Sequence, residues 1–376
     1  MKITEVEAIV VRQPSLDGAI ADGSQDDLII RIVTDEGIEG IGEVDSSPEV
    51  ARAVITAPRS HSLTGGLRDL LLGEDPLEIE RLWEKMYRGA IFLGRRGVAI
   101  HALSGIDIAL WDIKGKLLGK PVSELIGGRQ RDRVRAYASM LMPNTPSEVR
   151  EVVTEMRERG FTAVKLGWGP LGQSPANDIA LAAAACEAGG GGMAIMIDAG
   201  FAYGADPALA IPVARELESL GVYWLEEPFQ PDELDAYAAL ADVVELRIAA
   251  GEQDATLWSF RDLIERGRID VVQPDVTRCG GITEILKIIG VAESAGVQPV
   301  LHAWKSGIIK AASLHVNAVI GGSEVFQEYC VRETVINRDL THEAFALAAN
   351  GYVAVPTAPG LGVTLNQEIV DRYRVD

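Results

Sequence analysis

The sequence predicts an α/β protein in which an α+β N-terminal capping domain precedes a TIM-type (β/α) barrel. Short apolar runs recur about every 25 to 30 residues and alternate with amphipathic, helix-like segments, which is typical of parallel βαβ units. Three successive runs end on a carboxylate. In a closed barrel these strand ends converge on one face, where active sites lie. The 376 residues suit one barrel and a modest second domain.

Residues 1–130 are expected to form the capping domain. The β-like runs 27–34 and 38–44 flank Asp35-Glu36-Gly37. This pattern predicts a hairpin, because Gly accepts the positive φ that such a turn requires. The polar, Gly-containing stretch 13–26 precedes the hairpin, and we predict that it forms a flap.

The helical part of the capping domain follows the hairpin. From 77 to 116 apolar residues recur at intervals of three and four, which predicts helices. Gly127-Gly128 marks the boundary to the barrel domain. The end of the chain, about 350–376, has lost the βα alternation, and we expect it to return and complete the capping domain.

Residues 131–350 are expected to form the barrel. The segment 147–158 reads as its first helix, which Gly160 ends. The eight strand candidates are 134–139, 162–167, 194–197, 222–225, 247–251, 270–275, 298–302 and 324–328.

Asp198, Glu226 and Glu252 stand at the ends of the third, fourth and fifth strand candidates. Three carboxylates that converge without a basic residue among them repel one another, unless a cation lies between them. Ligation by oxygen alone favours a hard divalent cation, and magnesium over zinc. The sequence therefore predicts a Mg²⁺ site at this face of the barrel.

Asp275 and His302 end the sixth and seventh strand candidates. Neighbouring strand ends bring such side chains within hydrogen-bonding reach. An Asp on one imidazole nitrogen fixes the tautomer and raises the basicity of the other nitrogen, as a general base requires. An isolated His is more often a core residue bonded to a backbone carbonyl. The position of His302 opposite a carboxylate cluster favours the catalytic interpretation.

Lys165 lies near the end of the second strand candidate and points inward if strand alternation holds. A buried lysine beside several acids indicates a functional position, and the alternative is a lysine that reaches the rim. Glu328, at the end of the eighth strand candidate, is open to three interpretations: a ligand, a protonated hydrogen-bond donor or a rim carboxylate. Glu227 follows Glu226, so alternation predicts the opposite face and an ion pair with a helix.

The whole chain resembles the enolase superfamily, and most closely its mandelate racemase-like branch. The resemblance rests on the capping domain, the three strand-end acids, Ala109-Leu110-Trp111-Asp112, Trp224-Leu225-Glu226-Glu227-Pro228, and Pro274-Asp275 with His302. It implies that the three acids bind Mg²⁺, that the metal holds the substrate carboxylate, and that His302 with Asp275 is the base. It also implies that Glu328 binds the substrate carboxylate.

Two positions depart from the family pattern. The racemase pattern has a second lysine two residues after Lys165, but Gly167 stands there and cannot transfer a proton. Many acid-sugar dehydratases carry a polar residue where this chain has Gly200. With Lys165 as the only other candidate base, the sequence favours single-base chemistry by His302, with Gly167 and Trp168 making room or forming a wall.

The most consistent function is removal of the proton α to a carboxylate followed by β-elimination, that is, Mg²⁺-dependent dehydration of an acid sugar. Three alternatives stay open: a sugar-lactone cycloisomerase, a racemase or epimerase with Lys165 as second base, and a catalytically idle binding protein. We expect the flap 13–26, Trp168 and the segment His302-Ala303-Trp304-Lys305 to recognise the substrate.

Composition restricts the partners. The net charge of −20 opposes binding to nucleic acid, and no apolar run is long enough to span a bilayer. The N-terminal residues do not resemble a secretory signal, so we expect a cytoplasmic enzyme with a small-molecule carboxylate substrate. Barrels of this kind commonly associate, and we expect a homo-oligomer.

Overall fold

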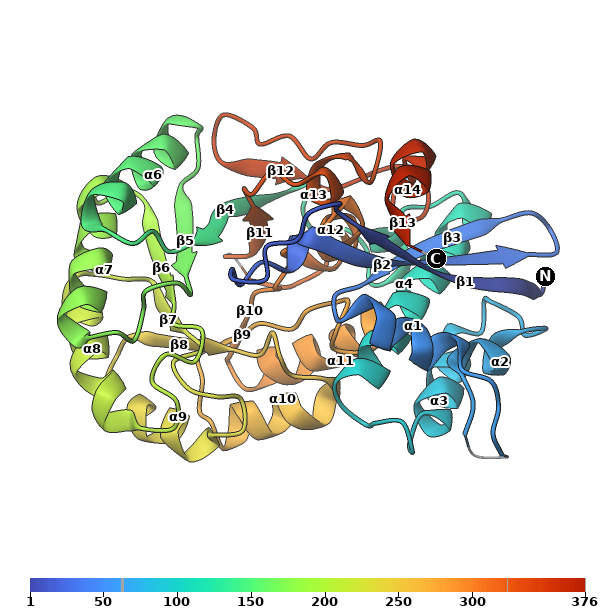
Figure 1. The fold of residues 1–376 in the computed structure, drawn as a ribbon, viewed down its shortest axis with the longest axis horizontal. Helices are drawn as coiled ribbons and strands as arrows, with labels where there is room; N and C mark the ends of the chain where they lie inside the picture. The colour runs from blue at the N-terminus through green and yellow to red at the C-terminus, as the bar shows by residue number, and fades with distance from the viewer. Residues whose placement is uncertain (62–63, 323, 376) are drawn as a thin grey trace.

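The computed structural model describes residues 1–61, 64–322 and 324–375 (Figure 1). The N-terminal region forms an antiparallel sheet in the order β13-β1-β2-β3. The predicted hairpin is confirmed, because β2 pairs with β3 around Gly37, whose φ is 78°. The strands are β1 (Ile3–Arg12), β2 (Asp26–Thr34), β3 (Glu39–Val44) and β13 (Arg374–Val375).

Helix α4 packs directly against this sheet and is mostly buried. Gly42 on β3 allows the close approach, because a Cβ atom there would lie 1.9 Å from the carbonyl oxygen of Gly105. The predicted helical segment is divided into α3 and α4. The elements of this region are η1 (Gly23–Gln25), α1 (Pro48–Thr56), α2 (Leu67–Leu71), α3 (Ile79–Gly89), α4 (Val98–Leu118) and α5 (Val122–Leu125).

The predicted barrel is confirmed. In the described part of the chain, parallel strands follow one another in the order β10-β9-β8-β7-β6-β5-β4-β11, and a parallel bridge between Leu301 and Gln327 joins the two ends of this series. The strands are β4 (Arg133–Leu141), β5 (Ala163–Gly167), β6 (Ala194–Asp198), β7 (Trp224–Glu226), β8 (Arg247–Ala250), β9 (Val271–Val272), β10 (Gln298–Pro299) and β11 (Phe326–Cys330).

Helices surround the barrel on the outside (Figure 1). They connect successive strands, so each strand begins at the same end of the barrel and finishes at the other. These helices are α6 (Pro146–Glu158), α7 (Pro175–Gly189), α8 (Pro207–Ser219), α9 (Leu234–Ala241), α10 (Thr256–Glu265), α11 (Gly281–Ser294) and α12 (Gly307–Asn317).

A layer of buried side chains fills the barrel interior beneath the strand ends. Each strand, or the residue directly after it, contributes one member, so the barrel is a packed core and its chemistry is confined to the face above. The members are Tyr137, Ala163, Met196, Trp224, Ala249, Val271, Val300 and Phe326.

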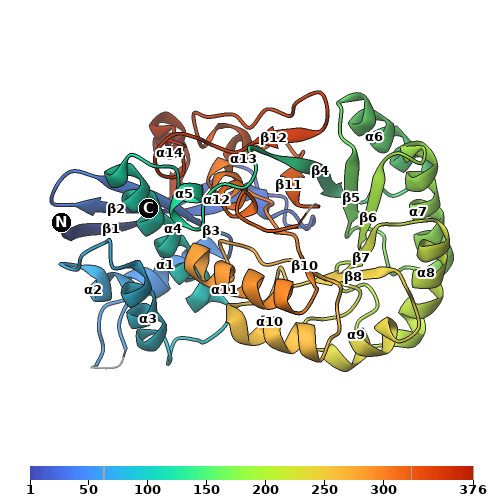
Figure 2. The ribbon, with the colours of Figure 1, turned by 180° about the vertical axis from the view of Figure 1, so that it is seen from behind.

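The C-terminal segment runs from the barrel back to the N-terminal sheet (Figure 2). Strand β12 (Tyr352–Ala354) pairs with β4, whereas β13 pairs with β1. Helices α13 (Val335–Asp339) and α14 (Gln367–Tyr373) belong to the same segment. Within the described ranges, no helix is long and apolar enough to cross a bilayer.

Candidate active site

A cavity of about 380 Å³ opens at the carboxyl ends of the barrel strands, and the β1–β2 loop covers one side of it. Asp22 and Gly23 of the predicted flap line this cavity. Six of the predicted site residues line it as well: Lys165, Trp168, Asp198, Glu252, His302 and Trp304. The structure therefore brings together side chains from distant parts of the chain.

The three predicted metal ligands lie together and are buried. Asp198 ends β6, Glu226 ends β7, and Glu252 follows β8. Each offers one carboxylate oxygen, and these oxygens lie within 4.8 Å of one another. Burial, followed by the charge of Glu226, holds the pKa of Asp198 well above its usual value. A divalent cation would remove this repulsion, so the donor set fits a hard metal ion.

Lys165 extends from β5 into the same cluster. Its Nζ lies 2.5 Å from Glu226 Oε1, 3.1 Å from Glu328 Oε1 and 3.7 Å from Asp198 Oδ2. Burial lowers the pKa of Lys165, but Glu226 and Glu328 outweigh it and raise this pKa well above its usual value. These ion pairs favour the protonated form of Lys165 in this arrangement.

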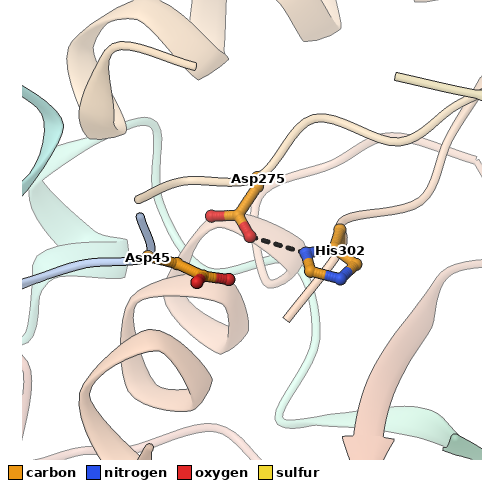
Figure 3. A group of neighbouring side chains, drawn as sticks. All are labelled: Asp45, Asp275 and His302. Atoms are coloured by element: carbon orange, nitrogen blue, oxygen red, sulfur yellow. Dashed lines mark hydrogen bonds and ion pairs between the residues drawn. The ribbon is translucent and has the colours of Figure 1, made fainter. Parts of the chain in front are cut away.

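Asp275 and His302 form the predicted hydrogen bond, with 2.6 Å between Asp275 Oδ2 and His302 Nδ1 (Figure 3). Asp275 Oδ1 accepts hydrogen bonds from the backbone N–H and the hydroxyl of Thr277, both at 2.6 Å, which fixes the carboxylate. The other ring nitrogen, His302 Nε2, lies 3.3 Å from Glu252 Oε2. The dyad therefore presents Nε2 to the acid cluster.

The electrostatic surroundings of His302 favour the imidazolium ion. Burial lowers its pKa, but Glu252, Glu328 and the hydrogen bond to Asp275 raise it to about 10. A cation bound to Glu252 would oppose the largest of these favourable charges. A cation at the predicted metal site would therefore lower the pKa of His302.

Asp45 and Arg278 were not predicted from the sequence, yet both adjoin the dyad. Arg278 Nη2 lies 2.6 Å from Asp45 Oδ2, Nη1 lies 3.4 Å from Glu252 Oε1, and Nε lies 3.9 Å from Asp275 Oδ2. The position of Arg278, three residues after Asp275, was the available signal. Asp45 comes from the N-terminal domain, directly after β3, and no local pattern places it here.

Asp45, Asp275 and His302 also form a compact group of potential metal-binding atoms (Figure 3). Asp45 is already neutralised by two cations, because Lys305 Nζ lies 3.0 Å from Asp45 Oδ1 and Arg278 binds the other oxygen. These cations hold the pKa of Asp45 below its usual range, even though burial opposes them. This group is therefore a charge network and does not suit a metal ion.

Trp304 and Lys305 of the predicted recognition segment lie in different surroundings. Trp304 lines the cavity, and its Nε1 donates to Asp22 Oδ1 of the flap at 3.1 Å. The prediction for Lys305 is wrong, because this side chain is 1% exposed and its Nζ donates to the backbone oxygen of Asp26 at 3.1 Å. The residue turns away from the cavity toward the N-terminal sheet, whose acids balance its charge.

Trp168, Gly167 and Gly200 are sterically linked. Trp168 has a φ of 58° and its ring lies over Gly200, where a Cβ atom would come within 2.6 Å of the indole. A Cβ atom at Gly167 would lie 2.5 Å from the Cβ of Asp198. Both glycines therefore occupy positions at which a longer side chain would displace either the indole wall or a predicted metal ligand.

Glu328 and Glu227 are both fully buried carboxylates beside the cluster. Lys165 and His302 lower the pKa of Glu328 to about 2 against the effect of burial, and Glu328 Oε2 accepts from the Ala303 N–H at 2.6 Å. These contacts favour the ionised form of Glu328 over the protonated hydrogen-bond donor.

The predicted ion pair of Glu227 is wrong: no salt bridge of Glu227 occurs among the described residues, and its buried Oε2 has no hydrogen-bond partner there. Strand alternation fails because β7 ends at Glu226 and Glu227 has a φ of 41°. Burial and then the charges of Glu252 and Asp198 hold the pKa of Glu227 well above its usual value. Glu227 therefore adds to the crowding of acids around the predicted metal position.

Three known proteins are similar to this chain over 82% of its length or more. A D-galactarolactone cycloisomerase of Agrobacterium fabrum is 34% identical over 360 residues, which cover 93% of this chain and 91% of that protein. An arabinonate dehydratase of Saccharolobus solfataricus is 36% identical over 311 residues, covering 82% and 81%. The crystal structure of the 3,6-anhydro-D-galactonate cycloisomerase from Zobellia galactanivorans has a TM-score of 0.89 at 31% identity and covers both chains completely.

Family descriptions match both parts of the chain. Residues 4–127 match the mandelate racemase / muconate lactonizing enzyme N-terminal domain, and residues 148–369 match the enolase C-terminal domain-like family. The second match alone spans more than half of the sequence. The chain therefore belongs to the mandelate racemase-like branch of the enolase superfamily.

Proposed function

We propose that this protein is a Mg²⁺-dependent acid-sugar dehydratase that converts a sugar acid into its 2-keto-3-deoxy acid. The observation that carries the proposal is the asymmetry of the site. His302 Nε2 faces the acid cluster with Asp275 behind it, whereas Lys165 is engaged in ion pairs with Glu226 and Glu328. One base suffices for elimination, but racemisation by proton transfer on both faces needs two.

Asp198, Glu226 and Glu252 would hold the metal ion. When bound there, Mg²⁺ supplies electrostatic stabilisation for the negative charge that develops on the substrate carboxylate. The nearby Lys165 ammonium adds a second positive charge on the same side. Arg278, fixed by Asp45, orients Glu252 through its contact with Oε1.

His302 moves the protons in this mechanism. Neutral Nε2 takes the proton from the carbon α to the carboxylate, while the Nδ1–H bond to Asp275 holds the ring in position. The electron pair left on the α-carbon then forms the α,β double bond, and the C–O bond to the β-hydroxyl breaks. The imidazolium returns its proton to the departing hydroxide, which leaves as water, and the resulting enol becomes the 2-keto acid.

The relatives support two closely related reactions. Arabinonate and D-galactonate dehydratases are among the similar proteins, and so is a D-galactarolactone cycloisomerase. Ring opening of a lactone by β-elimination begins with the same proton removal by His302. We therefore keep sugar-lactone cycloisomerisation as the second candidate function, while an epimerase and an idle binding protein have less support from the site.

The first test is a screen of mono- and di-acid sugars and their lactones with Mg²⁺ in deuterated water, followed by proton NMR. We expect a 2-keto-3-deoxy acid from one or a few stereoisomers. Product only from lactones would select cycloisomerisation instead. Exchange of the α-proton without elimination would contradict the dehydratase and favour an epimerase in which Lys165 acts as the second base.

His302→Asn should reduce kcat by at least about 10³-fold, because the general base is lost, and should not weaken Mg²⁺ binding, because the imidazolium that opposes a cation at Glu252 is removed. Steady-state kinetics and magnesium titration measure the two effects separately. His342→Asn, on an exposed histidine, is the matched control and should behave as the wild type. Substantial turnover by the His302 variant would mean that another group removes the proton.

A further inference from the structure

A second cavity, of about 180 Å³, lies beside the barrel where the last two strands end. It is formed by the residues after β11, the first turn of α12 and the short helix α13. Helix α12 packs against β11, and α13 lies next to them in both ribbon views (Figures 1 and 2). In (β/α) barrels, the loops after the seventh and eighth strands together with a short extra helix frequently form a phosphate site.

The lining of this cavity is positive in a strongly acidic protein. Four cationic residues line it against two acidic ones, whereas the whole chain carries a net charge of −20. The cations are Arg159, Lys310, Arg332 and Arg338, and the acids are Glu333 and Glu343. Both carboxylate oxygens of Glu343 already accept hydrogen bonds from Thr364, at 2.7 and 2.9 Å.

Lys310 is the cation that lacks a counter-ion. Its side chain is 7% exposed and its Nζ donates to Asn337 Oδ1 at 2.7 Å, above the ring of Tyr329. Among the described residues, no carboxylate lies within 4.0 Å of Lys310 Nζ, whereas Lys165 and Lys305 each have such partners. Burial accordingly lowers the pKa of Lys310. A buried ammonium group with unused donors is costly unless an anion joins it.

We propose that this cavity is a second ligand site, which binds a phosphate group with Lys310 at its base and Arg338 at its rim. A volume of about 180 Å³ admits a phosphate group but not a phosphorylated sugar as a whole, so a phosphomonoester would leave its organic part outside. The proposal is independent of the dehydratase reaction, because it uses none of the residues assigned to the metal or the dyad.

The cavity also connects to the flap. Arg332 lines the cavity and forms an ion pair with Asp22, while the Thr334 hydroxyl donates to the backbone oxygen of Ser24 at 3.1 Å. Asp22 in turn lines the main cavity and accepts from Trp304. A phosphate group that attracts Arg332 would compete with Asp22, so occupancy of the second site would be transmitted to the residues that cover the first.

The test is calorimetric titration of the full-length, Mg²⁺-loaded protein with inorganic phosphate, and in a second arm with glucose 6-phosphate. Lys310→Met should weaken phosphate binding at least about tenfold, because one charged hydrogen-bond donor is lost. Lys120→Met, on an exposed lysine, is the matched control. Asp198→Asn removes a predicted metal ligand, so it reports any phosphate held by the metal instead of by Lys310.

Binding that is weakened by Lys310→Met but retained by Lys120→Met and Asp198→Asn would support the site. Equal affinity of both anions would point to recognition of the phosphate group alone, and tighter binding of the monoester would point to contacts outside the cavity. Should Lys310→Met fail to fold, Arg338→Ala replaces it, since that side chain is 56% exposed. Unchanged affinity in the Lys310 or Arg338 variant, loss of binding in Asp198→Asn, or no binding by wild type up to about 20 mM phosphate would overturn the proposal.

Discussion

Gly167 determines where Asp198 can lie. The two residues are paired across β5 and β6, and any side chain at 167 would start 2.5 Å from the Asp198 Cβ. At the position of the second lysine in the racemase pattern, the neighbouring Asp198 therefore leaves no room for a side chain. A lysine at 167 would have to displace a predicted metal ligand before it reached the substrate.

Gly167→Ala should weaken Mg²⁺ binding at least about tenfold, because even one methyl group must shift the Asp198 carboxylate from its position. Isothermal titration calorimetry with Mg²⁺ measures the change in affinity. Gly192→Ala provides a matched control, since no atom lies within 4 Å of the position of the added Cβ. An unaltered magnesium affinity in Gly167→Ala would show that Asp198 is not a ligand or that the strand adjusts freely.

At the scale of single residues, the sequence was informative where a side chain ends a strand. Asp198, Glu226, His302 and Asp275 could be placed together because parallel strands finish at one face of the barrel. Glu227 could not, because its direction depends on a positive φ directly after β7. Asp45 could not be placed either, because its partner Arg278 lies in the other domain and no sequence pattern near Asp45 indicates the contact.

At the scale of elements, α12 is anchored by a neutral histidine. His315 Nδ1 accepts from the Ser123 N–H at 3.3 Å, and its Nε2 is 3.0 Å from the Leu361 carbonyl oxygen. It thereby ties α12 to the start of α5 and to the C-terminal segment. Burial lowers the pKa of His315 to about 4, because the charged ring would be desolvated and would lose its acceptor nitrogen.

The stability that His315 provides should decrease in acid. Below its unfolded pKa of 6.5 the unfolded chain binds the proton and the folded chain does not, so this contribution falls until the pH passes the folded pKa of about 4. Between pH 7 and 5 the loss is roughly 2 kcal/mol.

Urea unfolding at several pH values measures this effect. The difference in free energy of unfolding between wild type and His315→Gln should shrink by that amount between pH 7 and 5, since Gln can donate and accept but does not titrate. His342→Gln, at an exposed site, should follow the wild type at every pH. A pH-independent difference between wild type and His315→Gln would contradict a neutral His315.

The elements were predictable to different degrees. The hairpin and the order of the barrel strands followed from turn residues and repeated apolar runs, whereas β9 and β10 are only two residues long and could not be bounded. The helical pattern of 77–116 concealed a break between α3 and α4, where Gly97 has a φ of 63°. Periodicity continues through such a break, because both helices present apolar faces to one core.

At the scale of the whole molecule, the N-terminal sheet is attached to the barrel by buried charges directly after His302. Lys305 Nζ lies 3.0 Å from Asp45 Oδ1 and 3.7 Å from Asp27 Oδ1, and the Ser306 hydroxyl donates to Glu43 Oε2 at 2.6 Å. These contacts determine the position of the loop that carries the dyad. The two domains must therefore be docked for His302 to take its place.

Lys305→Met should lower the free energy of unfolding by about 3–5 kcal/mol, because two buried acids, Asp27 and Asp45, lose their shared cation. It should also reduce kcat, since the loop that follows His302 is released from the N-terminal sheet. Urea unfolding and steady-state kinetics measure the two consequences. Lys287→Met is the matched control, because Lys287 is 48% exposed and pairs with a single acid. A loss below about 1 kcal/mol would contradict the anchoring role.

The way in which the N-terminal domain packs on the barrel could not be predicted from the sequence. It depends on complementary details that lie far apart in sequence, such as Gly42 against Gly105 and Asp45 against Lys305. The chain length and the regular spacing of the strand candidates indicated two domains. The homo-oligomer stays a prediction. Which acids of the N-terminal sheet face the barrel is fixed only when β3, α4 and α12 are packed together.

The hydrogen bond between Trp224 and Glu226 should make the fluorescence of Trp224 sensitive to magnesium binding. Trp224 belongs to the layer that fills the barrel, and its Nε1 donates to Glu226 Oε2 at 2.9 Å. Because Glu226 is a predicted metal ligand, an indole bonded to it would experience the change in charge when a cation binds. The difference in ultraviolet fluorescence between wild type and Trp224→Phe should therefore follow magnesium occupancy without any added dye, giving the protein an intrinsic spectroscopic probe at the base of its catalytic face.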